Sequence, residues 1–371
     1  MAKYKLGDIC EIVSGSTPKT SVENYWDGDI KWITPAEIND DTYIINDSVR
    51  KITELGVQKT GLSPFPEGTI ILSSRAPIGK VAIAGCEMYC NQGFKNLICS
   101  DKIYNKYLYW FLKGNAAFLN SLGRGATFKE ISKAIVSEIE INVPNIEHQK
   151  EAVGALEKVS GVISLRKQEL LALDNLIKAR FVELFGLPGT DEKGWGLRPL
   201  GECCEINPRK VSDKRLSSGI QVSFVPMTAV SENGAIKTSE KKVYDEVKVG
   251  FTYFAENDVL FAKITPCMEN GKGAVAVGLC NGIGFGSTEF HVLRPFTGRS
   301  NPYWLYSLTT FDTFRKDAAA NMTGSAGQRR VPSIFLEKYK ITLPPMELQN
   351  QFADFVHQVD KSKFGKLNTR S

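Results

Sequence analysis

Basic side chains recur in loops that also contain glycine or proline, and these loops occur in both halves of the 371-residue sequence. A glycine-rich backbone can approach phosphates closely, and an arginine can read a guanine edge with two hydrogen bonds. The recurrence predicts contact with DNA, whereas an ordinary solvated surface is the alternative for any single residue. The candidates are Arg75, Lys80, Arg124 and Lys129 in the first half, and Lys263, Lys272, Gln328, Arg329 and Arg330 in the second.

Motifs for catalysis are missing from the sequence. It contains neither the phosphate-binding pattern GxxxxGK[ST] nor the amino-methyl-transfer pattern [DNS]PP[YF]. The histidines, His148, His291 and His357, are too few and too dispersed for a zinc site or a Ser-His-Asp site. We therefore predict that the chain is not an enzyme, has no catalytic or metal-binding residue, and binds no cofactor of its own.

Composition sets the broad class of the protein. The net charge of +5 permits nucleic-acid binding without demanding it. The 8 cysteines form no CxxC pair and are scattered through apolar stretches, which predicts buried free thiols in a reducing cytosol. No apolar run reaches the roughly 18 residues that a membrane span needs, and MAKYKLGDIC lacks the apolar core of a signal peptide. We expect a cytoplasmic protein without membrane contact.

Segments of the first half return in the second half in the same order. The pairs are LGDICEI and LGECCEI, GTIILSSRAP and NDVLFAKITP, KYLYWFL and PYWLYSL, and INVPNIEHQ and ITLPPMELQ, each roughly 190 to 200 positions apart. Coincidence does not keep order, so we interpret the sequence as an internal duplication with two equivalent globular units. Each unit is expected to mix strands (69–74, 80–84, 139–143, 340–343) with helices (104–113, 303–316), without regular βαβ alternation.

The middle of the sequence predicts one long helix, with Asn145 as its cap and a length of about 58 Å over residues 147–185. From Gln149 to Leu184 a seam of mostly apolar residues is spaced alternately by three and four, which is typical of a coiled coil. A second helix continues this pattern after Pro345, so antiparallel pairing of the two helices would hold the units at opposite ends of a rod. Packing of one amphipathic helix on a domain face is the alternative. The predicted contact residues are Leu156, Ile163, Leu170, Leu173, Ile177 and Leu184, with Phe352, Val356 and Val359 in the second helix.

The second helix departs from the first near its end. Lys363 and Lys366 stand where Ile163 and Arg166 map, and Gly365 weakens a helix by about 1 kcal/mol. We therefore expect part of the first helix to lack a partner within the chain, toward Leu173–Leu184 or else at the opposite end.

Taken together, these segments resemble the specificity subunits of type I restriction–modification systems over nearly the whole chain. The motifs are LGDICEIVSGSTPK, GTIILSSRAPIGKVAI, NQGFKNL, GATFKEIS and INVPNIEHQKEAV, followed by FGLPGTDEKGWGLRPLGE, DVLFAKITPCMENGKGA, GFGSTEFHVLRP and ITLPPMELQNQF. The resemblance implies two target recognition domains, each reading one half of a bipartite double-stranded DNA sequence. It also implies methyltransferase (M) subunits, which bring S-adenosylmethionine and methylate adenine, and a restriction (R) subunit. ATP and Mg would likewise be bound by these partner subunits.

The expected fold is therefore α+β, with two repeated mixed α/β recognition domains joined by long helices that form an antiparallel coiled coil. We place the first domain at 1–145, the central helix at 146–186, a linker and the second domain at 187–344, and a short distal helix at 345–371. Two other functions remain open: a self-contained methyltransferase or nuclease, and a dumbbell-shaped scaffold that binds only protein.

Overall fold

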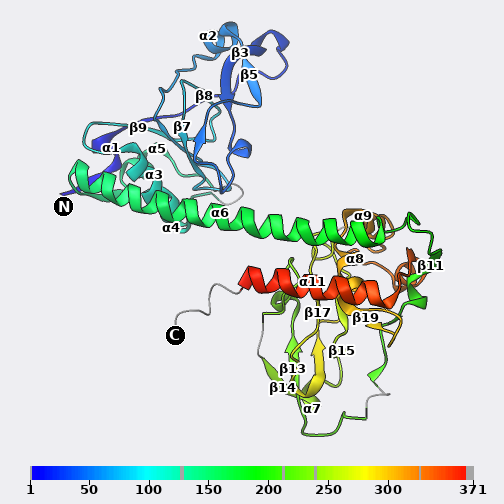
Figure 1. Ribbon diagram of the computed structural model, residues 1–371. Helices are drawn as coiled ribbons and strands as arrows, with labels where there is room; N and C mark the ends of the chain where they lie inside the picture. Colours follow the sequence, from blue (N-terminus) through cyan, green and yellow to red (C-terminus); the bar gives the residue numbers. More distant parts are fainter. Residues whose placement is uncertain (1, 126–128, 211–213, 238–239, 326, 365–371) are drawn as a thin grey trace. The chain divides into compact units, whose positions relative to one another are not determined.

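The computed structural model describes residues 2–125, 129–210, 214–237, 240–325 and 327–364, drawn as ribbons in Figure 1. It contains two compact units, Met1–Leu165 (unit 1) and Arg166–Ser371 (unit 2). The sequence predictions for Gly365 and Lys366 concern positions outside the described ranges. The same holds for residues 126–128 and 326, inside two of the basic loops.

Unit 1 combines short strands with short helices. Its strands are β1 (Ala2–Lys5), β2 (Cys10–Val13), β3 (Trp26–Ile33), β4 (Ile44–Ile45), β5 (Arg50–Ile52), β6 (Ile70–Leu72), β7 (Val81–Ala84), β8 (Tyr89–Cys90), β9 (Asn96–Cys99) and β10 (Glu140–Val143). Its helices before the long one are α1 (Leu6–Ile9), η1 (Glu23–Tyr25), η2 (Pro35–Glu37), α2 (Glu54–Thr60), α3 (Asn105–Gly114), α4 (Ala116–Ser121) and α5 (Lys133–Ser137). The sheets have the orders β2-β9-β6-β7-β4, β5-β3-β8 and β1-β10.

Unit 2 repeats this plan. Its strands are β11 (Leu197–Pro199), β12 (Cys204–Ile206), β13 (Gln221–Val225), β14 (Lys241–Val243), β15 (Thr252–Ala255), β16 (Val259–Ala262), β17 (Gly273–Val275), β18 (Ile283–Gly286), β19 (Phe290–Pro295) and β20 (Lys340–Thr342). Its helices are η3 (Leu200–Glu202), η5 (Met227–Ala229), α7 (Tyr244–Val247), η6 (Cys280–Gly282), α8 (Pro302–Thr309), α9 (Asp312–Ala320), α10 (Ser333–Lys338) and α11 (Met346–Phe364). The sheets have the orders β12-β19-β16-β17, β14-β13-β18-β15 and β11-β20.

The duplication of the sequence is a duplication of the fold. The order β2-β9-β6-β7 in unit 1 has the same form as β12-β19-β16-β17 in unit 2, and in both units the first and last strands of the unit pair antiparallel. The central strands β6 and β16 are buried at every position, as continuous apolar runs predict. The α+β class predicted from the sequence is confirmed.

The long helix α6 spans Ile146–Phe185. It begins where predicted, because the Asn145 side chain accepts a hydrogen bond from the His148 amide at 3.0 Å. It ends at Gly186, whose φ of 79° is the left-handed conformation that glycine adopts readily, and whose N–H donates to the Val182 carbonyl at 2.8 Å.

A buried glutamine attaches each long helix to its own unit. The Gln149 amide nitrogen donates to the carbonyls of Pro144 and Lys102 at 2.8 and 3.1 Å, and its oxygen accepts from the Tyr104 N–H at 2.7 Å. Gln349 makes the same three contacts in unit 2, with Pro344, Arg299 and Asn301. Both glutamines have an exposed fraction of 0%. Gln149 is therefore a polar anchor and not an interruption of a coiled-coil seam.

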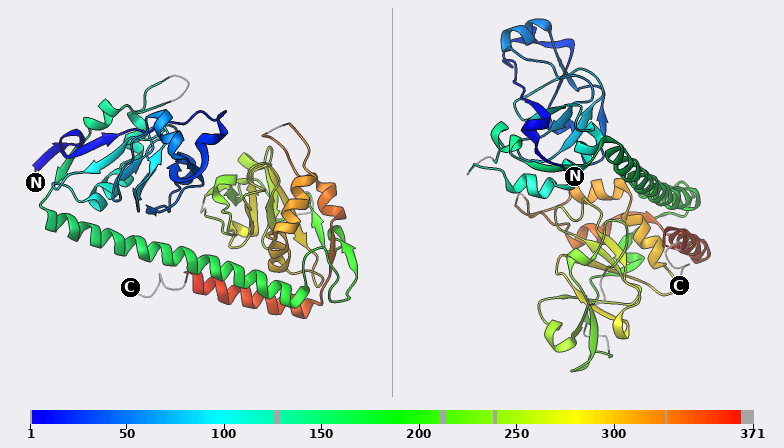
Figure 2. Two further views of the ribbon diagram at one scale, coloured as in Figure 1. Left: turned by 90° about the horizontal axis from the view of Figure 1, so that it is seen from above. Right: turned by 90° about the vertical axis from the view of Figure 1, so that its left-hand side faces the viewer.

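Within unit 2, α11 packs antiparallel against the C-terminal half of α6 (Figures 1 and 2). Near the start of α11, the Phe352 ring lies 5.5 Å from the rings of both Phe181 and Phe185, measured between centroids. Near its end, the Lys363 ammonium lies 2.7 Å from the Asp174 carboxylate, and the Lys363 carbonyl accepts a hydrogen bond from Arg166. The start of α11 therefore lies beside the end of α6, and the end of α11 lies beside an earlier part of α6. This confirms the predicted antiparallel pairing. Phe352, Val356 and Val359 are all buried in unit 2.

The prediction that Leu173–Leu184 lack a partner is wrong. Ile177 and Leu184 pack against the core of unit 2, and Leu170 and Leu173 are half-buried. The reason is geometric: in an antiparallel pair the first turns of α11 meet the last turns of α6. The opposite end of α6 contains exposed apolar residues, among them Leu156 and Ile163, which are 42% and 53% exposed. This exposure differs from the buried seam predicted for those two positions.

Lys363 was predicted to interrupt the apolar contacts of the second helix, but the structure shows it joining the two helices. Its side chain is only 10% exposed and forms ion pairs with Asp174 at 2.7 Å and Asp360 at 3.0 Å. Burial alone would lower the pKa of Lys363, but the hydrogen bonds that its ammonium group donates to the two carboxylates outweigh this effect and raise the pKa. The charge therefore joins the two helices.

Two smaller expectations need correction. The helix predicted at 303–316 is broken between α8 and α9, because Phe311 takes an extended conformation and packs its ring 5.0 Å from that of Phe181. All the cysteines are free, but Cys86, Cys99, Cys267 and Cys280 are half-buried instead of fully buried. Among the described residues, no helix is both long and apolar enough to cross a membrane.

We predict that Gln149→Leu destabilises unit 1 by about 2–4 kcal/mol, because two partly buried carbonyls and one N–H lose their partner. Urea unfolding measures the change. Gln168→Leu, on the exposed face of the same helix, is the matched control and should stay within about 0.5 kcal/mol of the parent. Equal effects of the two substitutions would contradict an anchoring role for Gln149.

Candidate nucleic-acid interface

Each unit builds its candidate interface from three loops. The first follows the central strand and contains a cis proline, at Ala76–Pro77 after β6 and at Thr265–Pro266 after β16. The second is the basic glycine-containing loop, which meets the first through isolated bridges: Arg75 with Glu130 in unit 1, and Ile264 with Arg330 in unit 2.

The third loop precedes β9 or β19 and is held by the same backbone bonds in both units. The Ser74 N–H donates to the Gly93 carbonyl at 2.7 Å, and the equivalent Lys263 N–H donates to the Glu289 carbonyl at 2.9 Å. The Ser74 and Lys263 carbonyls in turn accept from Ile131 and Val331, each at 2.9 Å. These bonds align the two units residue by residue, so that Gly93 corresponds to Glu289 and Glu130 to Arg330.

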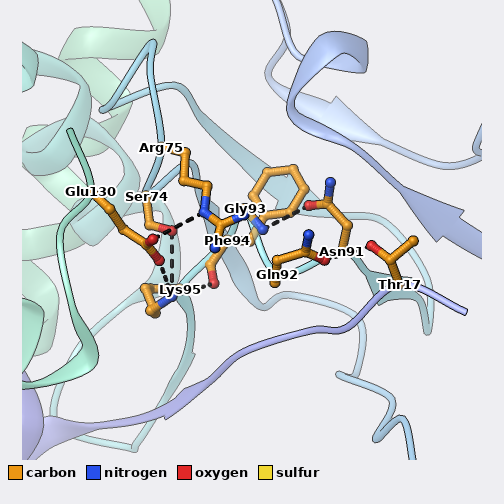
Figure 3. A network of polar contacts seen from close by, with 9 residues as sticks. All are labelled: Thr17, Ser74, Arg75, Asn91, Gln92, Gly93, Phe94, Lys95 and Glu130. Carbon is orange, nitrogen blue, oxygen red and sulfur yellow. Dashed lines mark hydrogen bonds and ion pairs between the residues drawn. The ribbon is translucent and has the colours of Figure 1, made fainter. Parts of the chain in front are cut away.

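In unit 1, a carboxylate and two cations meet at this junction (Figure 3). The Glu130 carboxylate accepts from Arg75 Nε at 3.0 Å and from Lys95 Nζ at 3.3 Å. Lys95 is 8% exposed and also lies 3.4 Å from the Ser74 hydroxyl. Burial would raise the pKa of Glu130, but the hydrogen bonds from Arg75 and Lys95 outweigh it and hold the pKa below its ordinary value of 4.5. Glu130 is therefore ionised at neutral pH.

In unit 2, the carboxylate comes from the other loop. Glu289 binds Arg330 through Nε at 2.9 Å and Nη2 at 2.7 Å, and the pKa of Glu289 is lowered mainly by these hydrogen bonds. His291 occupies the place of Lys95, and burial lowers its pKa, so it is neutral at pH 7. Its Nε2 donates to the Val331 carbonyl at 2.7 Å.

Lys263 completes the unit 2 cluster. No hydrogen bond or ion pair of its ammonium group occurs among the described residues, although the charges of Glu289 and Arg330 act on it. Burial lowers the pKa of Lys263, and the positive charge of Arg330 adds to this effect while Glu289 opposes it. This half-buried cation is thus available to an anionic or hydrogen-bond-accepting ligand.

Other predicted contact residues serve the protein's own backbone. Lys80 Nζ donates to the Pro35 carbonyl at 3.1 Å, and Lys272 Nζ lies 3.4 Å from the equivalent Met227 carbonyl. Arg329 Nη2 donates to the Ala319 and Met322 carbonyls at the end of α9, at 2.8 and 3.2 Å. These side chains hold the loops in place, which leaves the DNA contacts predicted for them as predictions. Arg124, Lys129 and Gln328 are exposed in the same loops.

Sequence analysis missed Lys95, Glu130, Glu289 and His291. Each lies in a segment that repeats between the halves, NQGFKNL against STEFHVL and FKEIS against QRRVP. Placing those segments in register would have set Glu130 against Arg330, Lys95 against His291 and Glu289 against Gly93. Within the described ranges, no group of three or more His, Cys, Asp or Glu side chains is arranged to hold a metal ion.

The duplicated α+β unit agrees with a family model that matches the chain twice, once over each half. The chain belongs to the family described as the type I restriction modification DNA specificity domain, which it matches over residues 1–175 and again over 192–370.

Individual relatives agree with this membership. The chain is 34% identical over 257 residues to the type I restriction enzyme MjaIX specificity subunit of Methanocaldococcus jannaschii, covering 64% of this chain and 59% of the relative. It is 43% identical over 161 residues to the EcoAI specificity subunit of Escherichia coli, covering 43% of this chain and 26% of the relative. The alignments thus span less than two thirds of these relatives. The crystal structure of a type I restriction–modification S subunit from M. genitalium shares the fold, with a TM-score of 0.52, 14% identity, and coverage of 98% of this chain and 90% of that one.

We predict that Glu130→Gln removes an acid-sensitive part of the stability of unit 1. Because the pKa of Glu130 is lowered on folding, its contribution is present above about pH 4.5 and is lost as the pH falls through the folded-state pKa. The variant should lose about 1–2 kcal/mol at pH 7, a figure reduced for screening because the side chain is 35% exposed.

The difference between parent and variant should shrink between about pH 5 and pH 3, as measured by urea unfolding at each pH. Glu138→Gln is the control, since Glu138 pairs with Lys5 on the surface and is 67% exposed. A pH-independent difference between the parent and Glu130→Gln would refute the ionised pair.

Proposed function

We propose that this chain is the DNA-recognition subunit of a type I restriction–modification complex, in which each unit reads one half of a bipartite double-stranded sequence. The observation that supports this most directly is the charged junction built twice on one backbone frame. Equivalent frames with different side chains are what two readers of different half-sites require.

We further propose that catalysis belongs to partner subunits. M subunits would bring S-adenosylmethionine and methylate adenine, and an R subunit would bring ATP- and Mg-dependent translocation and cleavage. The complex would act in the cytoplasm. Specificity subunits are non-catalytic in this assignment, in keeping with the absence of phosphate-loop and amino-methyl-transfer motifs from the sequence.

The two other candidate functions give opposite results in simple assays. A self-contained methyltransferase or nuclease would bind S-adenosylmethionine or nick DNA as the purified chain alone. A protein-binding scaffold would show no sequence-dependent DNA binding even with M present. The proposed subunit should show neither activity alone and a defined DNA sequence preference in the complex.

We predict that basic substitutions act on one half-site at a time. Arg75→Ala with Lys129→Ala should weaken protection of one half-site, and Lys263→Ala with Arg330→Ala should weaken the other. Each lost base contact should cost about 1–3 kcal/mol, whereas a lost phosphate contact should reduce the salt dependence of binding. Footprinting of the complex on its methylation site measures both.

The matched control replaces exposed lysines that lie outside the junctions, Lys133→Ala and Lys316→Ala, and should leave both half-sites protected. If either double variant weakened both half-sites equally, the assignment of one reader to each unit would be wrong.

The exposed stretch of α6 within unit 1 is the expected contact for M. Val159 and Ile163 are 58% and 53% exposed, and Val162 and Leu165 are each 66% exposed. Covering an aliphatic side chain stabilises an interface by roughly 1.5–3 kcal/mol, so an apolar stretch of this size favours a protein partner.

We predict that Val159→Glu with Ile163→Glu abolishes binding of M while unit 1 stays folded, because both side chains are already solvated. Co-purification and sedimentation velocity measure binding. Ser160→Glu with Ser164→Glu adds the same charges to exposed positions of the same helix and should preserve the complex. Retention of M by the first double variant would exclude this stretch as the contact.

A further inference from the structure

The guanidinium of Arg75 is held from one side and free on the other. Its Nε donates to Glu130 at 3.0 Å, whereas its terminal Nη1 and Nη2 have no hydrogen-bond partner among the described residues. The Arg75 side chain is 46% exposed and projects from the loop after β6 (Figure 3). The end of this partly exposed side chain therefore keeps two N–H groups, Nη1 and Nη2, that no described residue uses.

The carboxylate that holds Arg75 is itself fixed. Glu130 accepts from the ammonium of Lys95, whose side chain is only 10% exposed, and the Glu130 backbone pairs with Arg124 through N–H···O bonds of 2.9 and 3.0 Å. A surface arginine normally samples many rotamers, so anchoring its Nε reduces the conformational entropy that binding would cost.

The Nη1 and Nη2 groups of Arg75 suit a guanine base better than a phosphate. Two parallel donors match the O6 and N7 atoms of guanine and also match two phosphate oxygens. A phosphate placed at Nη1 and Nη2 would be repelled by the ionised Glu130 carboxylate on the same guanidinium. The guanine edge is uncharged and meets no such repulsion.

Unit 2 does not repeat this arrangement. Arg330 uses Nε and Nη2 on Glu289, and its Nη1 donates to the Gln328 carbonyl at 3.0 Å. The position equivalent to Arg75 is Ile264, and the unpartnered cation among the described residues of the junction is Lys263, one residue earlier. Arg330 is thus a positioning residue, and the two junctions offer different donors from the same frame.

We propose that Arg75 reads a guanine in the half-site of unit 1 through Nη1 and Nη2, with Glu130 and Lys95 as the positioning residues that fix its guanidinium. The inference rests on the proposed function and deepens it by naming the base and the side chains that select it. It requires that one half-site contain a G·C pair at a position contacted by unit 1.

The test is the methylation motif of the native complex. The full chain, parent or variant, is produced with its M partner in a host that lacks the system, and methylated adenines are located by sequencing the genome. Arg75→Ala should relax one G·C position to all four bases, with a loss of preference of roughly ten- to a hundredfold, and leave every other position unchanged.

Two further variants separate reading from folding. Arg75→Lys keeps the positive charge but lacks the two-donor end, and it should relax the same position. Glu130→Gln should relax that position partially, whereas a purely structural role for Glu130 would weaken the entire half-site. Lys133→Ala, an exposed cation near Glu130, should leave the motif intact.

Other outcomes overturn the proposal. If Arg75→Ala left the motif unchanged, or lowered methylation of all sites uniformly with a salt slope reduced by about one, Arg75 would not read a base. In that case the parent's sequence motif would still support the proposed function. If the parent chain conferred no motif at all, the proposed function itself would fail, and this inference with it.

Discussion

A buried amide hydrogen-bonded to three backbone groups is the contact on which each half of the molecule depends. Gln149 and Gln349 lie at the start of their helices, fully buried. Gln149 joins the turn after β10 to the loop before α3, and Gln349 joins the turn after β20 to the loop before α8. Burying such an amide costs little free energy only when every hydrogen-bond partner is present. The strand end, the loop and the helix start must therefore form together. The direction in which each long helix leaves its unit follows from this contact.

At the charged junctions, the backbone arrangement is the same in both units, whereas the side chains differ. Backbone hydrogen bonds of Ser74 and Lys263 hold the three loops in the same way in both units. The carboxylate, however, comes from a different loop in each unit: Glu130 in unit 1 and Glu289 in unit 2. A Cβ at Gly93 would lie 2.9 Å from the Asn91 side-chain oxygen and 3.0 Å from Pro35, so a glutamate there would require these side chains to shift. Unit 1 supplies its carboxylate from position 130. In the function proposed above, a frame that tolerates such exchange would let each unit acquire its own DNA preference without altering the core.

The sequence alone predicted what depends on local pattern. The duplication, the continuous apolar strands, the Asn145 cap and the antiparallel pairing are all visible in spacing and residue type. What it could not predict depends on contacts between distant positions. Lys95 and Glu130 are 35 positions apart and come together only in the folded unit. Arg329 donates to a carbonyl at the end of α9, and this contact is not visible in the sequence. Beyond Ile177, α6 also contacts α11 through Phe181 and Phe185, which pack in the core of unit 2 and were not among the predicted contact residues.

Val159 and Val359 occupy the same place in the repeat, yet the first is 58% exposed and the second 6% exposed. The second is covered because the C-terminal half of α6 lies against α11. The N-terminal turns of α6, in unit 1, have the same apolar spacing, yet Val159, Val162 and Ile163 there are exposed. Aliphatic side chains that are exposed to solvent bury no apolar surface within their own unit. A group of them at helical spacing therefore favours binding to another protein. This is why we assign these turns, and not the already paired end of α6, to a protein partner.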